Sequence, residues 1–260
     1  MCGIYLALSR KGSIPPPANL LELLQNRGPD HVNQIVHELE IDDGARESKA
    51  EIPRQNTFIS CASSVLSLRG HTTVVQPTTL STGLNGRSKS PFLCWNGEAW
   101  AFAGAAIQGN DSEHVLHLLS HVSHAAFSCQ SKSHEQAIAE ALASYSGPYA
   151  FAFYEPLLHR IYFGRDLLGR RSLLYRMTKE GDIILSSIPD GTGVQWAEVE
   201  ADGIYFIDLN SDSTTSDFEI QSTPYCFGSD TSATELRKVS PRGSVDYTGK
   251  LILLDRRYVH

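Results

Sequence analysis

The sequence has no long hydrophobic run and a deficit of positive charge. No stretch approaches the roughly 18 consecutive apolar residues that a membrane-spanning helix requires, which argues against an integral membrane protein. Lysine and arginine total 22 against 29 aspartate and glutamate, so the formal net charge is −7. A general nucleic-acid binder needs a basic face to meet the phosphates, so neither nucleic acid nor a membrane is an expected partner.

Cysteine is also scarce, with five residues in a chain of 260. Their number is odd and no two are spaced as Cys-x-x-Cys, so neither a disulfide framework nor a zinc ribbon is indicated. The first residues lack the basic and then apolar layout of a secretory signal. We therefore expect a reduced, soluble, cytoplasmic protein. Its hydrophobic content of 41% is enough for a core.

The N-terminal part of the chain shows strand patterns and one short helix. Cys2–Leu8 is mostly apolar, which predicts a strand, and Asn19 is placed to cap a leucine-rich helix. Gly28-Pro29-Asp30 should end that helix, and Asn96-Gly97 is typical of a tight hairpin turn. Further strands are expected over 34–41, 57–68 and 92–95, and exposed loops over 42–55 and 78–90.

Two helices are expected in the middle of the chain. A helix capped by Asp111 or Ser112 should end near Val122, and a second should cover His134–Tyr145. The pattern then changes to short strands separated by Gly and Pro, which predicts antiparallel hairpins. The predicted fold class is therefore α+β, with antiparallel sheets covered by helices.

Cys2 is the first candidate for chemistry. If Met1 is removed, the Cys2 thiol and a free α-amino group lie on one residue. An α-amino group has an ordinary pKa of roughly 7.7–8.0, so it can take the thiol proton directly or through a water. Gly3 adds no side chain that would obstruct a substrate. The alternative is that Cys2 is a small buried apolar residue without chemistry.

Asn96 and Gly97 are the second candidate. Attack of a thiolate on a carboxamide creates an oxyanion, which needs fixed donors about 2.7–3.1 Å away. The Asn96 amide and the Gly97 N–H can provide two such donors, and a glycine also allows close approach. The alternative is a plain hairpin turn.

Two arginine-containing motifs are interpreted as mainly structural. Arg27-Gly28-Pro29-Asp30 could line a pocket near the first strand, but a helix stop followed by a turn is favoured. Gly164-Arg165-Asp166 and Gly169-Arg170-Arg171 are expected to form a lattice of ion pairs at a strand–turn–strand corner.

Together these motifs resemble the class II glutamine amidotransferases, in the order and spacing of that family, over roughly residues 2–210. The sequence is most similar to the glutaminase half of the asparagine synthetases, and within them to the group of asparagine synthetase domain-containing proteins. The motifs that carry the resemblance are Met1-Cys2-Gly3-Ile4, Arg27-Gly28-Pro29-Asp30, Trp95-Asn96-Gly97-Glu98, Gly109-Asn110-Asp111-Ser112-Glu113 and Gly164-Arg165-Asp166-Leu167-Leu168-Gly169-Arg170.

The resemblance implies the fold of the N-terminal nucleophile hydrolases, a four-layer αββα sandwich of two antiparallel sheets. It implies hydrolysis of the glutamine side-chain amide to glutamate and ammonia, with Cys2 forming a thioester. Asn96 and Gly97 would form the oxyanion hole. Glu98 and Asp111 would bind the ammonium group of the substrate. A place in asparagine biosynthesis is implied as well.

One departure from the family concerns the carboxylate of the substrate. The family normally places an arginine just before the Leu-Ser stretch, where it pairs with that carboxylate, and our alignment puts Ser64 there. Arg69 could substitute, but five residues of strand span about 17 Å, so we expect Arg69 not to reach the same position unaided. A missing charged partner would weaken glutamine binding. A catalytically weak or inert amidotransferase-like scaffold therefore stays an alternative.

A second departure concerns the synthetase half. The sequence contains no Ser-Gly-Gly-x-Asp-Ser phosphate loop, so ATP and Mg²⁺ would belong to a domain that is absent, and no cofactor is expected in this chain. We expect residues 1–210 to form the glutaminase domain and residues 211–260 to be a linker-like tail. Glutamine is the expected ligand, and a separate ammonia-accepting synthetase is a candidate partner. Hydrolysis of another amide is a further alternative.

A row of histidines could suggest a metal site. His114, His117, His121 and His124 recur at a spacing that places them on one helix face. Apolar residues occupy the opposite face of the same predicted helix, so the histidines are expected to face water. No metal site is predicted.

Overall fold

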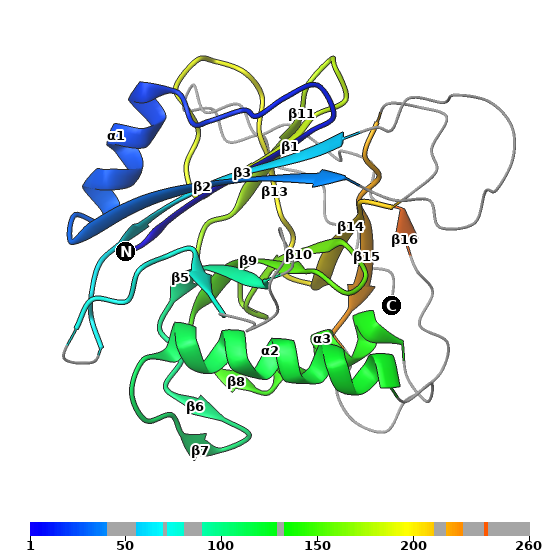
Figure 1. Ribbon diagram of the computed structural model, residues 1–260. Helices are drawn as coiled ribbons and strands as arrows, with labels where there is room; N and C mark the ends of the chain where they lie inside the picture. Colours follow the sequence, from blue (N-terminus) through cyan, green and yellow to red (C-terminus); the bar gives the residue numbers. More distant parts are fainter. Residues whose placement is uncertain are drawn as a thin grey trace, which may run out of the picture.

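The computed structural model describes residues 1–40, 56–69, 72–80, 90–128, 133–210, 217–225 and 237–238. Two antiparallel sheets stack face to face between helices, with one helix on the outer face of the first sheet and two on the outer face of the second (Figure 1). This is the predicted α+β, four-layer arrangement. The loop expected over 42–55, residues 81–89 of the loop expected over 78–90, and most of the tail over 211–260 lie outside the described residues. Thr78–Thr79, at the start of that second expected loop, instead form a short strand because they pair with the strand at 92–97.

The first sheet has the strand order β13-β11-β12-β1-β3-β2. Its strands are β1 (Gly3–Ser9), β2 (His31–Glu40), β3 (Asn56–Val65), β11 (Leu174–Met177), β12 (Ile183–Ser186) and β13 (Ala197–Glu198). The strand that starts the chain is therefore central, paired with β3 on one side and with β12 on the other.

The second sheet has the order β16-β15-β14-β10-β9-β5-β4, and a small third sheet has the order β7-β6-β8. The second sheet contains β4 (Thr78–Thr79), β5 (Phe92–Gly97), β9 (Tyr149–Glu155), β10 (Arg160–Arg165), β14 (Gly203–Asp208), β15 (Gln221–Pro224) and β16 (Arg237–Lys238). The third contains β6 (Ala101–Phe102), β7 (Ala105–Ala106) and β8 (Tyr145–Ser146).

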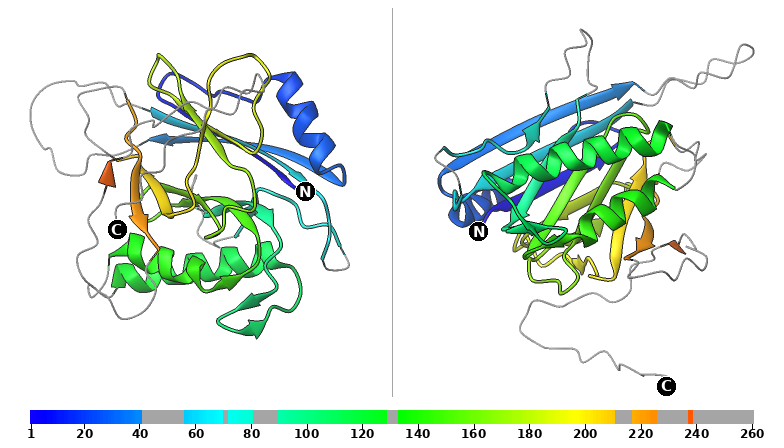
Figure 2. Two further views of the ribbon diagram at one scale, coloured as in Figure 1. Left: turned by 180° about the vertical axis from the view of Figure 1, so that it is seen from behind. Right: turned by 90° about the horizontal axis from the view of Figure 1, so that it is seen from below.

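Three helices cover the sheets: α1 (Ala18–Arg27), α2 (Asp111–Ser128) and α3 (His134–Ala143). Figure 2 shows α2 and α3 side by side across the second sheet, while α1 lies on the first. Within the described residues, no helix combines the length and the apolar character that crossing a membrane requires.

The alternation of side chains along each strand builds the layers. In β1, Ile4 and Leu6 face the core between the sheets, whereas Tyr5 packs under α1. In β5, Cys94 faces the same inter-sheet core, whereas Trp95 packs under α2 and α3. Both strands are therefore buried on both faces, because each sheet lies between another sheet and a helix layer.

Helix α1 begins without the predicted cap. Asn19 is its second residue, and its Nδ2 donates to the backbone oxygen of Asp190 at 2.7 Å instead. Pro17 precedes the helix and makes no side-chain cap bond. The helix is fastened near its other end, where Ser64 Oγ of β3 donates to Leu24 O at 2.5 Å.

Helix α2 is capped by the residue before the predicted cap. Asn110 Oδ1 accepts from the backbone N–H of Ser112 at 2.9 Å, so neither Asp111 nor Ser112 is the cap. The helix also continues past the predicted end at Val122, as far as Ser128. This frees the Asp111 carboxylate for other partners.

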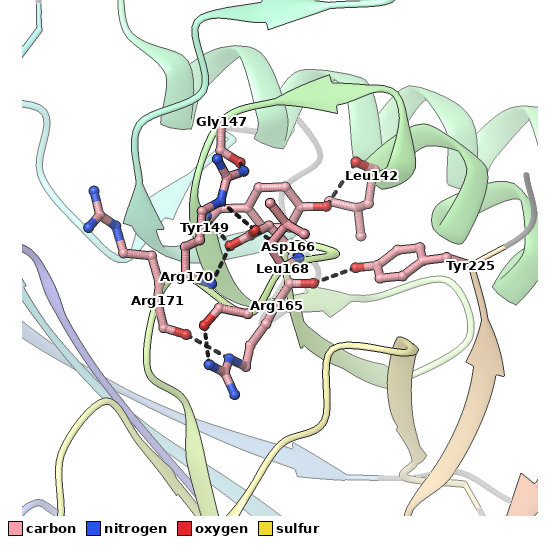
Figure 3. Close-up of polar contacts among 10 residues, drawn as sticks. Leu142, Gly147, Tyr149, Arg165, Asp166, Leu168, Arg170, Arg171 and Tyr225 are labelled. Carbon is pink, nitrogen blue, oxygen red and sulfur yellow. Dashed lines mark hydrogen bonds and ion pairs between the residues drawn. The ribbon is translucent and has the colours of Figure 1, made fainter. Parts of the chain in front are cut away.

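The corner after β10 confirms the predicted lattice (Figure 3). Asp166 accepts from Arg170 Nε at 2.8 Å and from the backbone N–H of Tyr149 at 3.1 Å. Arg165 pairs with Glu198 at 2.5 Å, donates to the carbonyl oxygens of Gly169 and Arg171 in the same turn, and donates to Val199 O beyond β13. These bonds fix the start of β9, which pairs with the end of β5.

Candidate active site

A cavity with about 380 Å³ of empty space, partly open to solvent, lies where β1 begins and β5 ends. Five of the six predicted site residues line it: Cys2, Arg69, Gly97, Glu98 and Asp111. They come from four separate stretches of the chain, which only the folded sheets and helices bring together.

Cys2 is 8% exposed and directly precedes β1. By alternation with Ile4, its side chain belongs to the inter-sheet side of the first sheet. The backbone N–H of Leu66 donates to Cys2 Sγ at 3.4 Å. Burial raises the pKa of the Cys2 thiol, while the Leu66 N–H, the terminal ammonium group and the Arg171 guanidinium act in the opposite direction. A backbone donor aimed at sulfur is suited to stabilise a thiolate.

Asn96 does not form the expected hairpin turn. It belongs to β5 and is paired with Ala150 of β9, because the ladder continues one residue further to Gly97. By alternation with Cys94, its side chain belongs to the inter-sheet side of the second sheet, which faces the side that carries Cys2. Asn96 itself does not line the cavity.

The Asn96 amide is buried without compensation. The residue is 1% exposed, and neither its Oδ1 nor its Nδ2 has a hydrogen-bond partner among the described residues. A buried amide without a partner costs about 1–3 kcal/mol. An amide kept at that cost in a strand next to a cavity is characteristic of a group that bonds to a ligand.

Gly97 is required by packing as well as by access. A Cβ atom there would lie 2.8 Å from the Trp95 ring and 2.8 Å from Tyr149 Cβ. The Trp95 and Tyr149 rings stack with centroids 5.0 Å apart, so they cannot easily give way. The cavity wall at this point is therefore backbone.

Two carboxylates lie in the cavity wall. Asp111 is 6% exposed, and its Oδ2 accepts from Trp95 Nε1 and from the backbone N–H of Ala99, both at 2.9 Å. Asp111 is also the first residue of α2, where the helix dipole favours a negative charge. Glu98 is half-buried and lines the same cavity. This pair supplies the negative charge that a substrate ammonium would need.

Arg69 lines the cavity, although its distance along an extended strand argued that it would not reach the family's arginine position unaided. The prediction assumed extended strand up to Arg69, but β3 ends at Val65 and the following residues leave the sheet. The Arg69 guanidinium donates to the backbone oxygens of Ala99 and Ile107, which hold it at the cavity. The cavity lining therefore contains one arginine and two carboxylates.

The expected arginine position must move by one residue. Ser64 lies on the α1 face of β3, where its hydroxyl bonds to Leu24, and it does not line the cavity. Val65 is the last residue of β3 and does line the cavity. It also directly precedes the Leu66-Ser67 stretch. The position that faces the cavity is thus Val65, which is uncharged.

Sequence reasoning missed two contributors to the site. The side chain of Gln76 is buried in the cavity wall, and its Oε1 accepts from the backbone N–H of Trp95 at 2.7 Å. The Leu66 N–H that contacts Cys2 is a backbone group. Neither contributor could be predicted from the sequence. Gln76 lies in a stretch without periodicity, and every residue except proline has a backbone N–H, so residue types do not show which one will act as a donor.

The Arg27-Gly28-Pro29-Asp30 motif positions the segment that contacts the thiol. A Cβ atom on Gly28 would lie 2.5 Å from the backbone nitrogen of Val65, so this close approach needs glycine. Asp30 Oδ2 accepts from the backbone N–H of Ser67 at 2.7 Å. Arg27 Nε donates to the backbone oxygen of Cys2 at 3.3 Å. The predicted structural role is confirmed, and it acts on the candidate site.

The histidine row on α2 is mostly exposed. His114 differs, because it is half-buried and its Nδ1 lies 2.9 Å from Tyr145 Oη, whereas His117, His121 and His124 face water. Across the described part of the chain, no cluster of three or more His, Cys, Asp or Glu side chains could hold a metal ion.

Comparisons with known proteins found related sequences and solved structures with a similar fold. No protein-family model matches the chain. It is 32% identical over 236 residues to asparagine synthetase domain-containing protein 1 of Bos taurus, covering 88% of this chain and 32% of that protein. It is 31% identical over 218 residues to the protein of the same name from Homo sapiens, covering 81% and 29%. The chain thus spans about a third of the length of these curated relatives.

Solved structures agree at the level of the fold. Glutamine phosphoribosylpyrophosphate amidotransferase from B. subtilis, in complex with ADP and GMP, superimposes with a TM-score of 0.54. It is 18% identical, and the match covers 87% of this chain and 50% of that chain. An allosteric regulatory enzyme of purine biosynthesis gives the same TM-score of 0.54. At this level of identity the likeness establishes the fold alone.

Proposed function

Because this chain is related over most of its length to the asparagine synthetase domain-containing proteins and has the N-terminal nucleophile amidotransferase fold, we propose that it is a glutamine amidotransferase domain. It hydrolyses the side-chain amide of glutamine to glutamate and ammonia. The observation that carries the proposal is the shared cavity of Cys2, Gly97, Glu98 and Asp111.

The proposed nucleophile is Cys2 after removal of Met1. The α-amine accepts the thiol proton, and Sγ attacks the side-chain carbonyl carbon of glutamine. The carbon–sulfur bond forms, the carbon–nitrogen bond breaks, and the proton carried by the amine leaves with ammonia. Water then attacks the thioester, which releases glutamate and restores the thiol. The Leu66 N–H at 3.4 Å supports this role because it stabilises negative charge on sulfur.

Asn96 and Gly97 are proposed to hold the oxyanion. The tetrahedral intermediate places negative charge on the former carbonyl oxygen, and fixed donors in a site with little water stabilise it strongly. The Asn96 amide without a partner and the backbone at Gly97 support this role. Removal of one such donor typically lowers kcat by about 100- to 1000-fold.

Glutamine is proposed to bind as the zwitterion. Glu98 and Asp111 bind its ammonium group, and Arg69 binds its carboxylate in place of the arginine that Val65 does not supply. Arg69 is anchored by two carbonyl oxygens and keeps further N–H donors, because a guanidinium group has five. A scaffold without activity is not favoured, because the cavity contains charged groups of both signs.

The ammonia acceptor is proposed to be a synthetase domain of the asparagine-forming type that lies outside these 260 residues. The name of the relatives and their greater length support this. Any ATP and Mg²⁺ would bind to that domain, and no residue of the cavity described above is assigned to them.

The proposal is tested by ammonia release. The intact mass of the purified protein is first measured by mass spectrometry to establish loss of Met1. The protein is then incubated with glutamine. We expect ammonia from the wild-type protein and none above background from Cys2→Ala. Cys129→Ala, which removes a cysteine that the proposal does not use, serves as the matched control and should keep wild-type activity. Equal release from the wild-type protein and Cys2→Ala would contradict the proposal.

A further inference from the structure

Two guanidinium groups from distant parts of the chain converge on the first residue. Arg171 Nη1 donates to Met1 Sδ at 3.2 Å, and Arg27 Nη2 approaches the same sulfur at 3.9 Å. Arg27 also donates to the backbone oxygen of Cys2 through Nε at 3.3 Å. Arg27 ends α1, whereas Arg171 follows β10, and its side chain points away from the Arg165–Asp166 lattice in Figure 3.

Within the described ranges, no acidic side chain neutralises the positive charge of this pair. Among the described residues, no carboxylate lies within ion-pair distance of Arg27 or Arg171. The Arg171 Nε atom is buried, and it has no hydrogen-bond partner among the described residues. The thioether that both groups meet is a weak acceptor. The two arginines also repel each other, and burial together with Arg171 lowers the pKa of Arg27.

We propose that Arg27 and Arg171 are positioning residues that keep the mature α-amine of Cys2 in its uncharged form, ready to accept the thiol proton. This inference rests on the proposed function, in which that amine is the general base. Removal of Met1 takes away the thioether and moves the amine one residue along the chain. The Arg27 bond to the Cys2 carbonyl keeps the new terminus beside the pair.

The charges around the terminus agree with this role. At the present terminus, burial lowers the pKa of the amine most, Arg27 and Arg171 lower it further, and the Cys2 thiol and Asp30 raise it. Asp111 raises the pKa of the Cys2 thiol, on the residue that carries the mature amine, and so opposes the two arginines. Because a cation disfavours a second cation, loss of either arginine should raise the pKa of the amine.

The experiment is the pH dependence of kcat/KM for ammonia release from glutamine. The general base must be uncharged, so activity rises as the pH passes the pKa of the amine. Arg171→Gln should move this acid limb to higher pH by about half to one unit, since one unit charge nearby is worth about that much in a well-solvated site. Arg171→Lys keeps the charge and should restore the wild-type profile. Lys179→Gln, which removes a charge from an exposed turn, is the matched control and should not move the limb.

A second arm uses the wild-type protein alone and does not depend on the folding of a variant. Raising the salt concentration from about 0.05 M to about 0.5 M screens exposed charges and should also move the acid limb to higher pH. An acid limb that stays in place in Arg171→Gln and in high salt, while ammonia is released, would overturn this inference alone. Absence of Cys2-dependent ammonia release from protein without Met1 would overturn the proposed function, and this inference with it.

Discussion

At the scale of single residues, the buried amide of Asn96 lowers stability in a way that its proposed role in the reaction would explain. Its amide is buried in a strand between two sheets and has no partner among the described residues. A protein selected for stability alone would have an apolar residue at this position, because an apolar side chain there carries no unsatisfied donor or acceptor. The cost becomes understandable when the amide bonds to an oxyanion.

Asn96→Leu should therefore stabilise the protein and abolish its activity. Leucine keeps the branching of asparagine without its polar atoms, so we expect the free energy of unfolding to rise by about 1–3 kcal/mol. Urea denaturation measures the stability, and ammonia release measures the activity. Gln25→Leu, on the exposed side of α1, is the control and should change neither. A less stable but active Asn96→Leu protein would show that the amide has no role in the reaction.

Val65 and Ser64 differ by one position and lie on opposite faces of β3. Val65→Arg should add a guanidinium to the cavity and lower KM for glutamine by about tenfold, because a hydrogen bond to a charged group contributes about 1.5–3 kcal/mol. Val65→Met has a long side chain without charge and should not lower KM. Steady-state kinetics measure both variants.

Ser64→Arg tests the same assignment from the other face. The larger side chain would displace α1 at Leu24, so we expect a loss of about 3 kcal/mol or more in the free energy of unfolding and no gain in glutamine affinity. A fall in KM with Ser64→Arg, and none with Val65→Arg, would reverse the assignment of the pocket-facing position.

At the scale of elements, the contact between α1 and β3 places the backbone donor for the thiol. The turn after α1 packs on the end of β3 through Gly28, and Asp30 holds the next segment through Ser67. Leu66, which lies between these contacts, presents its N–H to Cys2. The helix thus influences the reaction without contributing a side chain to the cavity.

Gly28→Ala should damage both stability and activity. The added Cβ would lie 2.5–2.7 Å from the backbone of β3, which cannot move without separating the strands. We expect a loss of about 3 kcal/mol in the free energy of unfolding and a lower kcat, because the Leu66 N–H shifts away from sulfur. Thermal and urea denaturation give the stability, and ammonia release gives kcat.

Gly191→Ala provides the control for Gly28→Ala. A Cβ atom added at Gly191 would meet no other atom within 4 Å, but the residue has a φ of +72°. Alanine should therefore lower the free energy of unfolding by only about 1–2 kcal/mol through backbone strain and leave kcat unchanged. If both variants lose stability but keep full activity, the α1–β3 contact does not position the donor.

At the scale of the whole molecule, the stacking of the two sheets creates both the core and the cavity. Cys61 of β3 and Cys94 of β5 contact each other across the inter-sheet core, and burial raises the pKa of the Cys61 thiol well above its ordinary value. Cys2 belongs to the same layer but lies at its open end, in the cavity wall. The reactivity of these thiols should therefore distinguish the closed core, which contains Cys61 and Cys94, from the cavity wall, which contains Cys2.

A thiol-reactive maleimide should label Cys2 in the native protein and should reach Cys61 and Cys94 only after global unfolding. Since a folded domain is unfolded for about 10⁻³ or less of the time, we expect the two core thiols to react at least about 1000-fold more slowly than in denaturant. Peptide mass spectrometry over time distinguishes the sites. Glutamine should slow labelling of Cys2 alone. Labelling of Cys61 as fast as Cys2 in native buffer would contradict the stacked sheets.

The sequence by itself determined the fold class, five of the residues that line the cavity and the lattice at the corner after β10. These follow from local chemistry: alternating apolar residues, turn residues and motifs whose side chains bond to near neighbours, as between Asp166 and Arg170. It did not determine that Asn96 continues a strand, since Asn-Gly favours a turn until pairing with β9 overrides that preference.

Only the tertiary structure decided which side chains face the cavity. One residue along a strand reverses the face, so Ser64 points to α1 while Val65 lines the pocket. Arg69 reaches the cavity because β3 ends early, and the Leu66 N–H reaches Cys2 because two strands and a helix meet there. Residue types set what chemistry is available, whereas the pairing and packing of distant segments set which groups meet.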